Sequence, residues 1–473
     1  MRFYRIREYM TFLGDEGRDM LVVKRMIVDH KFTLLGPITS VGSIYMGPIY
    51  YYFMVPFLWL WRMDPVGPSI MVAIVSVLTI ALLYKLGAEF FHPTVGLLSS
   101  FIYAISRLTI IYGHSSWNPN VVPFFALVII YCLLKVIVKK KYRWLAIAGL
   151  SLGVLIQLHY VTLMFIPIIL VSLFLIRFRI PIRYYLMSVL GFILTYSPFL
   201  TFELRHNFVN LQSVWRFIWE QKRSAPPTIF STFNVVFDVL VRLFWRIVVI
   251  ENAELTKLFM IGVILIVGFV WLKKEKNKKS LMSMKVVIIW LVVGMASFGL
   301  YHGIIYDYYL GSLFPIPALL SALMLYTLWK MHKIGKVSVA ILLFFIVYFN
   351  FKNSPLRIEP NNMLRNTETI SRFIYEKSEG KPYNFALIAL HNSDHAYRYF
   401  LEVWGHPPIT IENQAVDPER KTVTDQLLVV CEEKICQPLG HSLWEIAGFG
   451  RAEVTGEWPV VTTKVFRLVH YKT

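Results

Sequence analysis

Ten apolar runs fill most of the first 350 residues, and each approaches the length of a helix that crosses a bilayer. About 20 apolar residues are needed to span the roughly 30 Å hydrocarbon core. One soluble core could not bury so many runs, so the sequence predicts an α-helical polytopic membrane protein of about ten spans. The runs are Val66–Phe90, Thr94–Tyr112, Val121–Val138, Trp144–His159, Val161–Ile176, Tyr184–Leu204, Thr256–Leu272, Val286–Tyr301, Leu310–Trp329 and Val337–Phe349.

Strongly basic segments separate alternate runs and indicate how the helices are oriented. Because Lys and Arg accumulate in cytoplasmic loops, these segments are expected to face the cytoplasm of a protein in the cell membrane. The long stretch Glu203–Glu254 and the other polar connections are then expected outside the cytoplasm. The basic segments are Lys139–Arg143, Arg177–Arg183, Lys273–Lys279 and Lys330–Lys336.

The net charge of +19 belongs to the part of the chain that is expected in the membrane. Residues 351–473 hold 14 of the 48 Lys and Arg residues and 15 of the 29 Asp and Glu residues, so this tail is close to neutral. A nucleic-acid-binding protein would concentrate its basic residues on a soluble module. We therefore expect no nucleic acid among the partners, and assign the charge to contacts with membrane lipid.

The tail alternates strand-like and helix-like segments, which predicts a small extracytoplasmic α/β domain. The expected organisation is a first outer loop (1–65), a transmembrane domain (66–350) and this tail domain (351–473). Cys431 and Cys436 lie in the tail, where a disulfide is permitted and a free pair is the alternative. The tail segments are Asn384–Leu390, His395–Gly405, Gln426–Glu432, Ser442–Gly450 and Val460–His470.

The first 65 residues conflict with the charge rule. They are expected outside, yet the chain starts MRFYRIR with three arginines. The aromatic run Tyr45–Trp61 contains Gly47, Pro48 and Pro56, and is typical of an interfacial segment rather than of a span. Either this start is translocated despite its charge, or one more spanning helix precedes Met1. We favour the second explanation.

An acidic motif, GDEGRD at Gly14–Asp19, precedes the helix-like segment Met20–His30. The pair Asp15 and Glu16 suits a general base held at a membrane surface. An ordinary helix start accounts for the pattern equally well, with Asp15 as the N-cap and with Glu16 and Asp19 favourable to the helix dipole. The residues alone leave both interpretations open.

Further polar residues fall on the same predicted side as this motif. Arg205 and His206 could bind a phosphate, although charged groups at the end of a span also reach into water without any ligand. Turn chemistry and the aromatic belt offer similarly ordinary explanations for Asn118 and Tyr308, whereas His302 and Asp307 are less expected at such a boundary. That all of them fall on one side is not required by a purely structural account. The other outer-face candidates are Asp19, Asn118, Glu203, His302, Asp307 and Tyr308.

Six motifs in order along residues 12–350 resemble the C-type (GT-C) membrane glycosyltransferases. More narrowly, they resemble the protein O-mannosyltransferase and aminoarabinose transferase-like family, glycosyltransferase family 39-like. The resemblance implies a GT-C-like bundle and a polyprenyl-phosphate sugar donor. It also implies inverting transfer to an acceptor glycan, lipid or protein on the outer face. The motifs are FLGDEGRD (Phe12–Asp19), LLGPITSVG (Leu34–Gly42), GPIYYYFMVPFLWLW (Gly47–Trp61), SWNPNVVPFF (Ser116–Phe125), SPFLTFELRHNF (Ser197–Phe208) and YDYYLGSLFPIPALL (Tyr306–Leu320).

Within this resemblance, Asp15 matches the catalytic base and Glu16 is its acidic neighbour. Arg205 and His206 are assigned to the donor phosphate, with Arg18 and Lys24 as weaker candidates. Contact with anionic headgroups is the alternative role for Lys24.

The lipid-linked sugar is expected as a substrate, with no cofactor and no metal, the alternative being a metal held by Asp15 and Asp19. The competing function is a transporter or flippase of lipid-linked saccharides. Such a protein would place ionisable groups at the bilayer midplane, where these spans have almost none.

Overall fold

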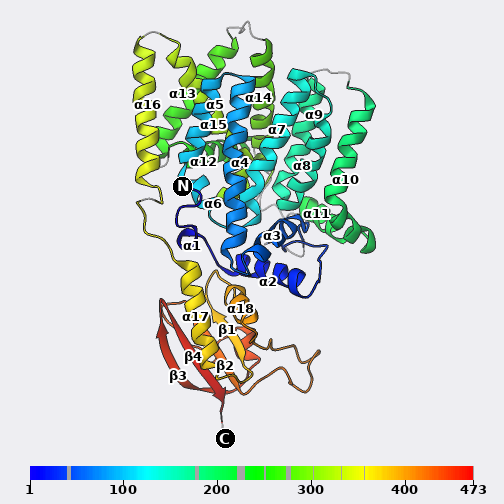
Figure 1. Cartoon of the computed structure of the whole chain (residues 1–473), viewed down its shortest axis with the longest axis vertical. Helices are drawn as coiled ribbons and strands as arrows, with labels where there is room; N and C mark the ends of the chain where they lie inside the picture. Colours follow the sequence, from blue (N-terminus) through cyan, green and yellow to red (C-terminus); the bar gives the residue numbers. More distant parts are fainter. Residues whose placement is uncertain are drawn as a thin grey trace. The chain divides into compact units, whose positions relative to one another are not determined.

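The computed structural model describes residues 1–39, 44–175, 180–220, 229–249, 252–272, 278–301, 303–331, 333–355 and 357–471. The chain forms two compact units (Figure 1). The helical unit comprises Met1–Tyr4, Phe32–Met54 and Ser69–Glu359, and the tail unit comprises Arg5–Lys31, Val55–Pro68 and Pro360–Thr473.

Helices and short 3-10 turns account for nearly all of the regular structure before residue 353. After α1 (Ile6–Tyr9) and α2 (Gly14–Val28), the elements are α3 (Ile49–Leu60), α4 (Val66–Phe90), α5 (Pro93–Ile105), α6 (Arg107–Tyr112), η1 (Asn118–Val121), α7 (Val122–Lys139), α8 (Trp144–Leu158), η2 (Tyr160–Met164), α9 (Phe165–Leu175), α10 (Ile182–Arg205), α11 (Val209–Glu220), α12 (Ile229–Ile247), α13 (Ala253–Leu272), α14 (Lys278–Gly299), η3 (Asp307–Leu313), α15 (Pro315–Trp329) and α16 (Lys333–Lys352).

Among the described residues, five helices are each long and apolar enough to cross a membrane. A sixth span forms if η3 and α15, which meet at a bend of 55°, are taken together. All ten predicted runs fall on helical segments, and the predicted class, an α-helical polytopic membrane protein, is confirmed. The five helices are Val66–Phe90, Asn118–Lys139, Ile182–Arg205, Lys278–Gly299 and Lys333–Lys352, and the shorter apolar helices are Ile49–Leu60, Pro93–Ile105, Trp144–Leu158 and Tyr160–Phe174.

Most of the described residues in the stretch Glu203–Glu254 are helical and form α11 and α12. Helix α12 is apolar on most of its surface but bears Asp238, Arg242 and Arg246 at four-residue spacing. These charges interrupt the apolar run in the sequence, although they share one face of the helix.

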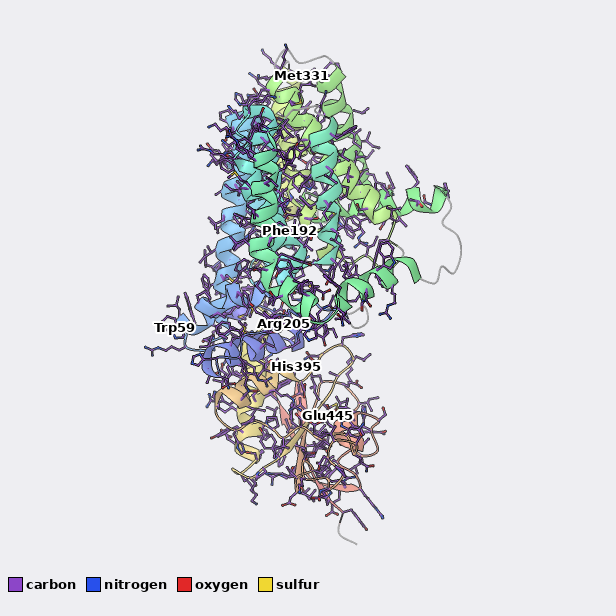
Figure 2. The ribbon with its side chains drawn as sticks, turned by 90° about the vertical axis from the view of Figure 1, so that its right-hand side faces the viewer. Trp59, Phe192, Arg205, Met331, His395 and Glu445 are labelled. Carbon is purple, nitrogen blue, oxygen red and sulfur yellow. A yellow bond between two sulfur atoms is a disulfide. The ribbon has the colours of Figure 1, made fainter. Side chains whose placement is uncertain are left out.

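Small residues let α8 and α10 approach closely. A Cβ at Gly149 would overlap the carbonyl oxygen of Ser188, and one at Gly153 would lie 2.7 Å from that of Phe192. A small residue at every fourth position is a common device for packing membrane helices. Arg205 is the last residue of α10 and lies at one end of the helical unit, whereas Met331 lies at the opposite end (Figure 2).

The tail unit contains a mixed four-stranded sheet of order β1-β2-β4-β3. β1 and β2 pair in parallel, and the other pairs are antiparallel. The predicted run Val460–His470 covers β4 and the last residue of β3. The rest of β3 was not predicted, because its sequence contains charged residues and a glycine. The elements are α17 (Met363–Lys377), β1 (Asn384–Ile388), α18 (His395–Val403), β2 (Gln426–Cys431), α19 (Trp444–Ala447), β3 (Ala452–Val460) and β4 (Thr463–His470).

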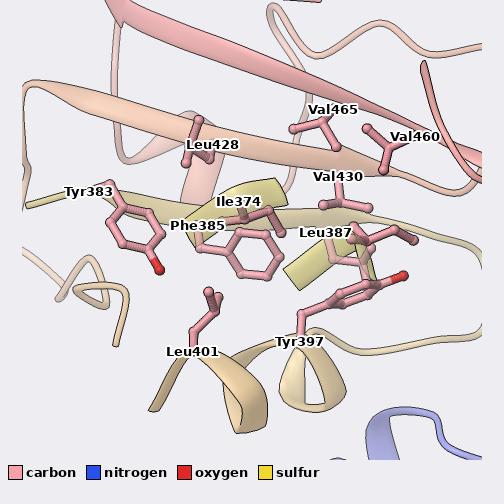
Figure 3. Packing of buried hydrophobic residues seen from close by; sticks show 11 residues of the cluster. Ile374, Tyr383, Phe385, Leu387, Tyr397, Leu401, Leu428, Val430, Val460 and Val465 are labelled. Atoms are coloured by element: carbon pink, nitrogen blue, oxygen red, sulfur yellow. The ribbon is translucent and has the colours of Figure 1, made fainter. Parts of the chain in front are cut away.

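Buried side chains of the tail cover both faces of its sheet. On one face, Tyr397 and Leu401 of α18 point toward Phe385 and Leu428 of the strands (Figure 3). Cys431 lies in the cluster on the other face and forms a disulfide with Cys436, which settles the alternative between a disulfide and a free pair.

The first 65 residues are divided between the two units. Within the tail unit, the N–H of Asn362 donates to the carbonyl of Glu8 at 2.9 Å. The hydroxyl of Tyr399 donates to the carbonyl of Met63 at 2.6 Å. These bonds join Arg5–Lys31 and Val55–Pro68 to the rest of the tail unit.

Candidate functional site

The acidic motif, Gly14–Asp19, lies in the first turns of α2. Leu13 occupies the N-cap position, and its N–H donates to the carboxylate of Glu16 at 3.0 Å. A glutamate that reaches back in this way satisfies one of the free N–H groups at a helix start. Glu16, rather than Asp15, therefore supplies the side-chain oxygen at the start of the helix.

Arg18 bridges two carboxylates of the motif. Its Nη1 lies 2.9 Å from Asp15 Oδ1, and its Nε and Nη2 lie 3.0 and 2.9 Å from Asp19 Oδ1. Asp19 is fully buried, whereas the side chain of Asp15 is 55% exposed. The carboxylate of Asp15 is therefore open to solvent, while its partner Arg18 is held in place by the buried Asp19.

Burial raises the pKa of Glu16 to about 7. The N–H bonds of Leu13 and Glu16 oppose this rise, while the negative charges of Asp15 and Asp19 add to it. Between pH 4.5 and 7, folding therefore retains a proton on Glu16 that the unfolded chain has lost. The stability of the tail unit is expected to fall as the pH rises through this window.

Glu16→Gln should remove this pH dependence, because glutamine keeps the oxygen that accepts from Leu13 and cannot ionise. The variant is expected to match the wild type near pH 5. At pH 8 it should be more stable by roughly 1–3 kcal/mol, from 1.4 kcal/mol per unit of pKa. Thermal unfolding of the detergent-purified protein at several pH values measures this. Glu419→Gln, at an exposed site, is the control, and an equal difference at pH 5 and pH 8 would contradict the assignment.

The loop between β1 and α18, together with the first turn of α18, contacts the acidic motif. The N–H of Gly14 donates to Asn392 Oδ1 at 2.9 Å, and a Cβ at Gly17 would overlap the backbone of Ala396. His395 pairs through Nδ1 with the hydroxyl of Ser393 at 2.8 Å, and burial lowers the pKa of His395. In the sequence, this HNSDH segment is ordinary loop composition, and nothing in chain order ties it to residues 14–19.

Lys24 faces a carboxylate of the tail. Its Nζ lies 3.2 Å from Glu402 Oε1, and Arg25 Nη2 lies 2.9 Å from Glu402 Oε2. These ion pairs hold α2 on α18. The pairing gives Lys24 a structural role that the sequence did not reveal.

In the helical unit, Glu203 closes the turn between α10 and α11. Its Oε1 accepts from Asn210 Nδ2 at 2.9 Å, and its Oε2 accepts from the N–H of Leu211 at 3.0 Å. Asn210 in turn accepts the N–H of Tyr45 at 2.9 Å. This buried carboxylate therefore satisfies the start of α11 and fixes the position of Tyr45.

Arg205 and His206 are exposed at the end of α10. His206 stacks on Phe202 with ring centroids 4.0 Å apart, and its Nδ1 lies 2.9 Å from the Phe202 carbonyl oxygen. In the described part of the chain, the guanidinium of Arg205 has no hydrogen-bond or ion-pair partner. Its side chain is exposed to solvent.

The structure brings the Trp117–Asn118 turn together with Asp307 and Tyr308. Trp117 and Tyr308 contact each other with ring centroids 4.5 Å apart. Asn118 is buried, and its Nδ2 donates to the carbonyl of Leu158 at 2.6 Å. Asn118 thus anchors the turn, while His302, predicted beside these residues, lies outside the described residues.

Asp307 pairs with two arginines that the sequence analysis missed. Arg242 Nη2 lies 2.9 Å from Asp307 Oδ1, and Arg246 Nε lies 2.8 Å from Asp307 Oδ2. Both arginines belong to α12, and two arginines four residues apart in an apolar run were the available signal. This pairing neutralises Asp307 and ties η3 to α12.

The metal alternative gains no support from this geometry. The guanidinium of Arg18 already sits between Asp15 and Asp19. Across the described ranges, no three His, Cys, Asp or Glu side chains are close enough to hold a metal ion together.

Comparisons with known proteins extend this picture. Residues 46–202 match the family described as dolichyl-phosphate-mannose-protein mannosyltransferase. ArnT from Cupriavidus metallidurans, solved bound to undecaprenyl phosphate, is similar with a TM-score of 0.64 and 13% identity, covering 98% of this chain and 95% of that one. The Archaeoglobus fulgidus oligosaccharyltransferase, solved with a tethered acceptor peptide, is similar with a TM-score of 0.52 and 13% identity. The likeness covers 88% of this chain and 65% of that one. Among curated sequences, none matches. At these identities the structural likenesses establish the fold.

Proposed function

We propose that this chain, which has the fold of the C-type membrane glycosyltransferases, transfers a sugar from a polyprenyl-phosphate donor to an acceptor. The observation that carries the proposal is the exposed carboxylate of Asp15, which is paired with Arg18 next to the buried Asp19. The match to the mannosyltransferase family and the likeness to an ArnT structure that holds undecaprenyl phosphate support the donor class.

In this proposal, Asp15 takes the proton of the acceptor hydroxyl while the acceptor oxygen attacks the anomeric carbon. The bond from that carbon to the phosphate oxygen breaks, and the polyprenyl phosphate departs with the electron pair. Attack opposite the departing phosphate inverts the anomeric centre. A base placed in this way typically contributes 10²–10⁴-fold to the rate.

The basic connections and the charge rule support the membrane orientation. Lys139–Arg143 and Lys330–Lys336 follow α7 and α15, and we assign their side to the cytoplasm. Arg205, at the other end of the helical unit from Met331, then faces outward from the cell membrane. The acceptor would be met on this outer face.

The direct experiment adds labelled polyprenyl-phosphate sugars, in a panel, to membranes with and without the protein. Transfer of label from one of these donors, and not from the matching nucleotide sugars, is the expected result. Label that enters product equally from nucleotide sugars would overturn the donor class.

The proposal includes no metal. Transfer should therefore keep at least half of its rate in excess EDTA, because Arg18 rather than a cation balances Asp15 and Asp19. Rates before and after EDTA, with added Mg²⁺ or Mn²⁺ as the control, measure this. A loss of activity that either ion restores would show that a metal takes part.

Arg205→Ala should mainly weaken donor use, because it removes a charged donor to the phosphate. A charge-assisted hydrogen bond of about 1.5–3 kcal/mol corresponds to a rise of roughly 10–100-fold in the half-saturating donor concentration. Arg183→Ala is the matched control, an exposed arginine at the other end of the same helix. If both variants show the same donor dependence as the wild type, Arg205 does not bind the phosphate.

A further inference from the structure

The acidic motif is bonded to the carboxyl edge of the parallel strands of the tail. β1 and β2 are parallel from Asn384 opposite Leu427 to Ile388 opposite Cys431, so both strands end at the same edge. The N–H of Glu432, just past β2, donates to the carbonyl of Ile388 at 3.0 Å. In open α/β sheets, ligands bind outside this edge, where the loops leave the strands.

Asn392 links this edge to the motif with both ends of its amide. Its Oδ1 accepts the N–H of Gly14 at 2.9 Å, and its Nδ2 donates to Glu432 Oε1 at 2.9 Å. The hydroxyl of Tyr397 also donates to Glu432 Oε1 at 2.7 Å. The β1–α18 loop is therefore held in one position against the residue that precedes Asp15.

Three exposed polar groups remain for a ligand at this position. Ser393 packs directly on Gly14, and its hydroxyl pairs with His395 Nδ1. Within the described part of the chain, no hydrogen bond is made by His395 Nε2, so this nitrogen can bind a ligand. The side chains of His395 and Asp15 are 41% and 55% exposed (Figure 2 labels His395). The charges of Asp15 and Arg18 both act on His395, so the three groups share one environment.

The local charge does not suit a phosphate. Each arginine beside these groups already contacts a carboxylate: Arg18 contacts Asp15 and Asp19, and Arg398 contacts Asp394. Glu432 adds a further negative charge at the same edge. Neutral hydroxyls are suitable partners instead, because they can donate hydrogen bonds to a carboxylate and both donate to and accept from imidazole and hydroxyl groups.

We propose that Ser393 and His395, at the carboxyl edge of the tail sheet, bind the hydroxyl-bearing acceptor beside Asp15, and that the donor phosphate is bound by other residues. This inference rests on the proposed function and makes it more specific. It assigns acceptor binding to the tail, and the choice of acceptor to the β1–α18 loop and the first residue of α18.

The test uses the full chain and a detergent extract of the membranes that supply the acceptor. The extract is titrated at saturating labelled polyprenyl-phosphate sugar, and the donor is then titrated at saturating extract. Ser393→Ala and His395→Gln should each raise the half-saturating amount of extract at least fivefold. The half-saturating donor concentration should stay within twofold of the wild type.

Lys381→Gln is the control, since this exposed residue precedes β1 and so lies at the amino end of that strand, away from its carboxyl end. Unfolding midpoints equal to the wild type establish that the variants are folded, and the exposed Ser393 gives an answer even if His395→Gln does not fold. Wild-type dependence on the extract, or an equal change in donor dependence, would overturn the acceptor role while the wild type still transfers sugar. Absence of transfer by the wild type would instead refute the proposed function.

Discussion

Asp15→Asn is expected to lower sugar transfer by at least 100-fold while leaving the amount of folded protein unchanged. Asparagine keeps the oxygen that faces Arg18 but cannot take a proton, so the acceptor hydroxyl loses its base. Because Asp15 is more than half exposed, the substitution costs little stability. The rate of label transfer from a polyprenyl-phosphate sugar in membranes, normalised to the folded protein, measures the effect.

Asp29→Asn provides the matched control, because it changes an exposed aspartate just past the end of the same helix. It should transfer sugar at the wild-type rate. An Asp15→Asn protein that transfers at the rate of this control would remove Asp15 from the base role, and the reaction would then need another carboxylate.

Gly17→Ala should destabilise the tail unit by about 1–3 kcal/mol, the usual cost of adding a methyl group to a packed site. The new Cβ would overlap the backbone of Ala396, which cannot rotate away as a side chain can. The shift would also separate Asp15 from the β1–α18 loop. Transfer should therefore fall even where the protein remains folded. Thermal unfolding together with transfer rates measures both effects.

The matched control is Gly268→Ala, another helix-interior substitution, at a glycine where an added Cβ meets nothing within 4 Å. That variant should equal or slightly exceed the wild type in stability, because alanine favours helices over glycine. Equal stability of the two variants would show that α2 and α18 do not pack as closely as described.

The bounds of a helix were predictable from the sequence where the helix is apolar along its whole length. The runs at Val66–Phe90 and Val121–Val138 coincide closely with α4 and α7, since length and hydropathy alone define them. Helix α12 was not found, because its charges at Asp238, Arg242 and Arg246 lower the local hydropathy. Those charges become intelligible only once Asp307, distant in the sequence, is placed against two of them.

The candidate site shows the same division between local and long-range information. A short acidic motif indicated that Asp15 and Glu16 matter, but only the fold shows that Glu16 is buried at the helix start and Asp15 is exposed. Ser393 and His395 lie nearly 380 residues further along the chain. Their proximity to the motif depends on the glycines of α2 and on Asn392, whose packing no local pattern encodes.

The most direct measurement uses the purified chain in liposomes, a donor labelled with ³²P in its phosphate and ³H in its sugar, and acceptor extract. We expect ³H to move to the acceptor while ³²P stays with the polyprenyl lipid, because transfer breaks the bond between the sugar and the phosphate. Movement of both labels together across the bilayer, on an intact donor, would show a transporter and contradict sugar transfer by this protein.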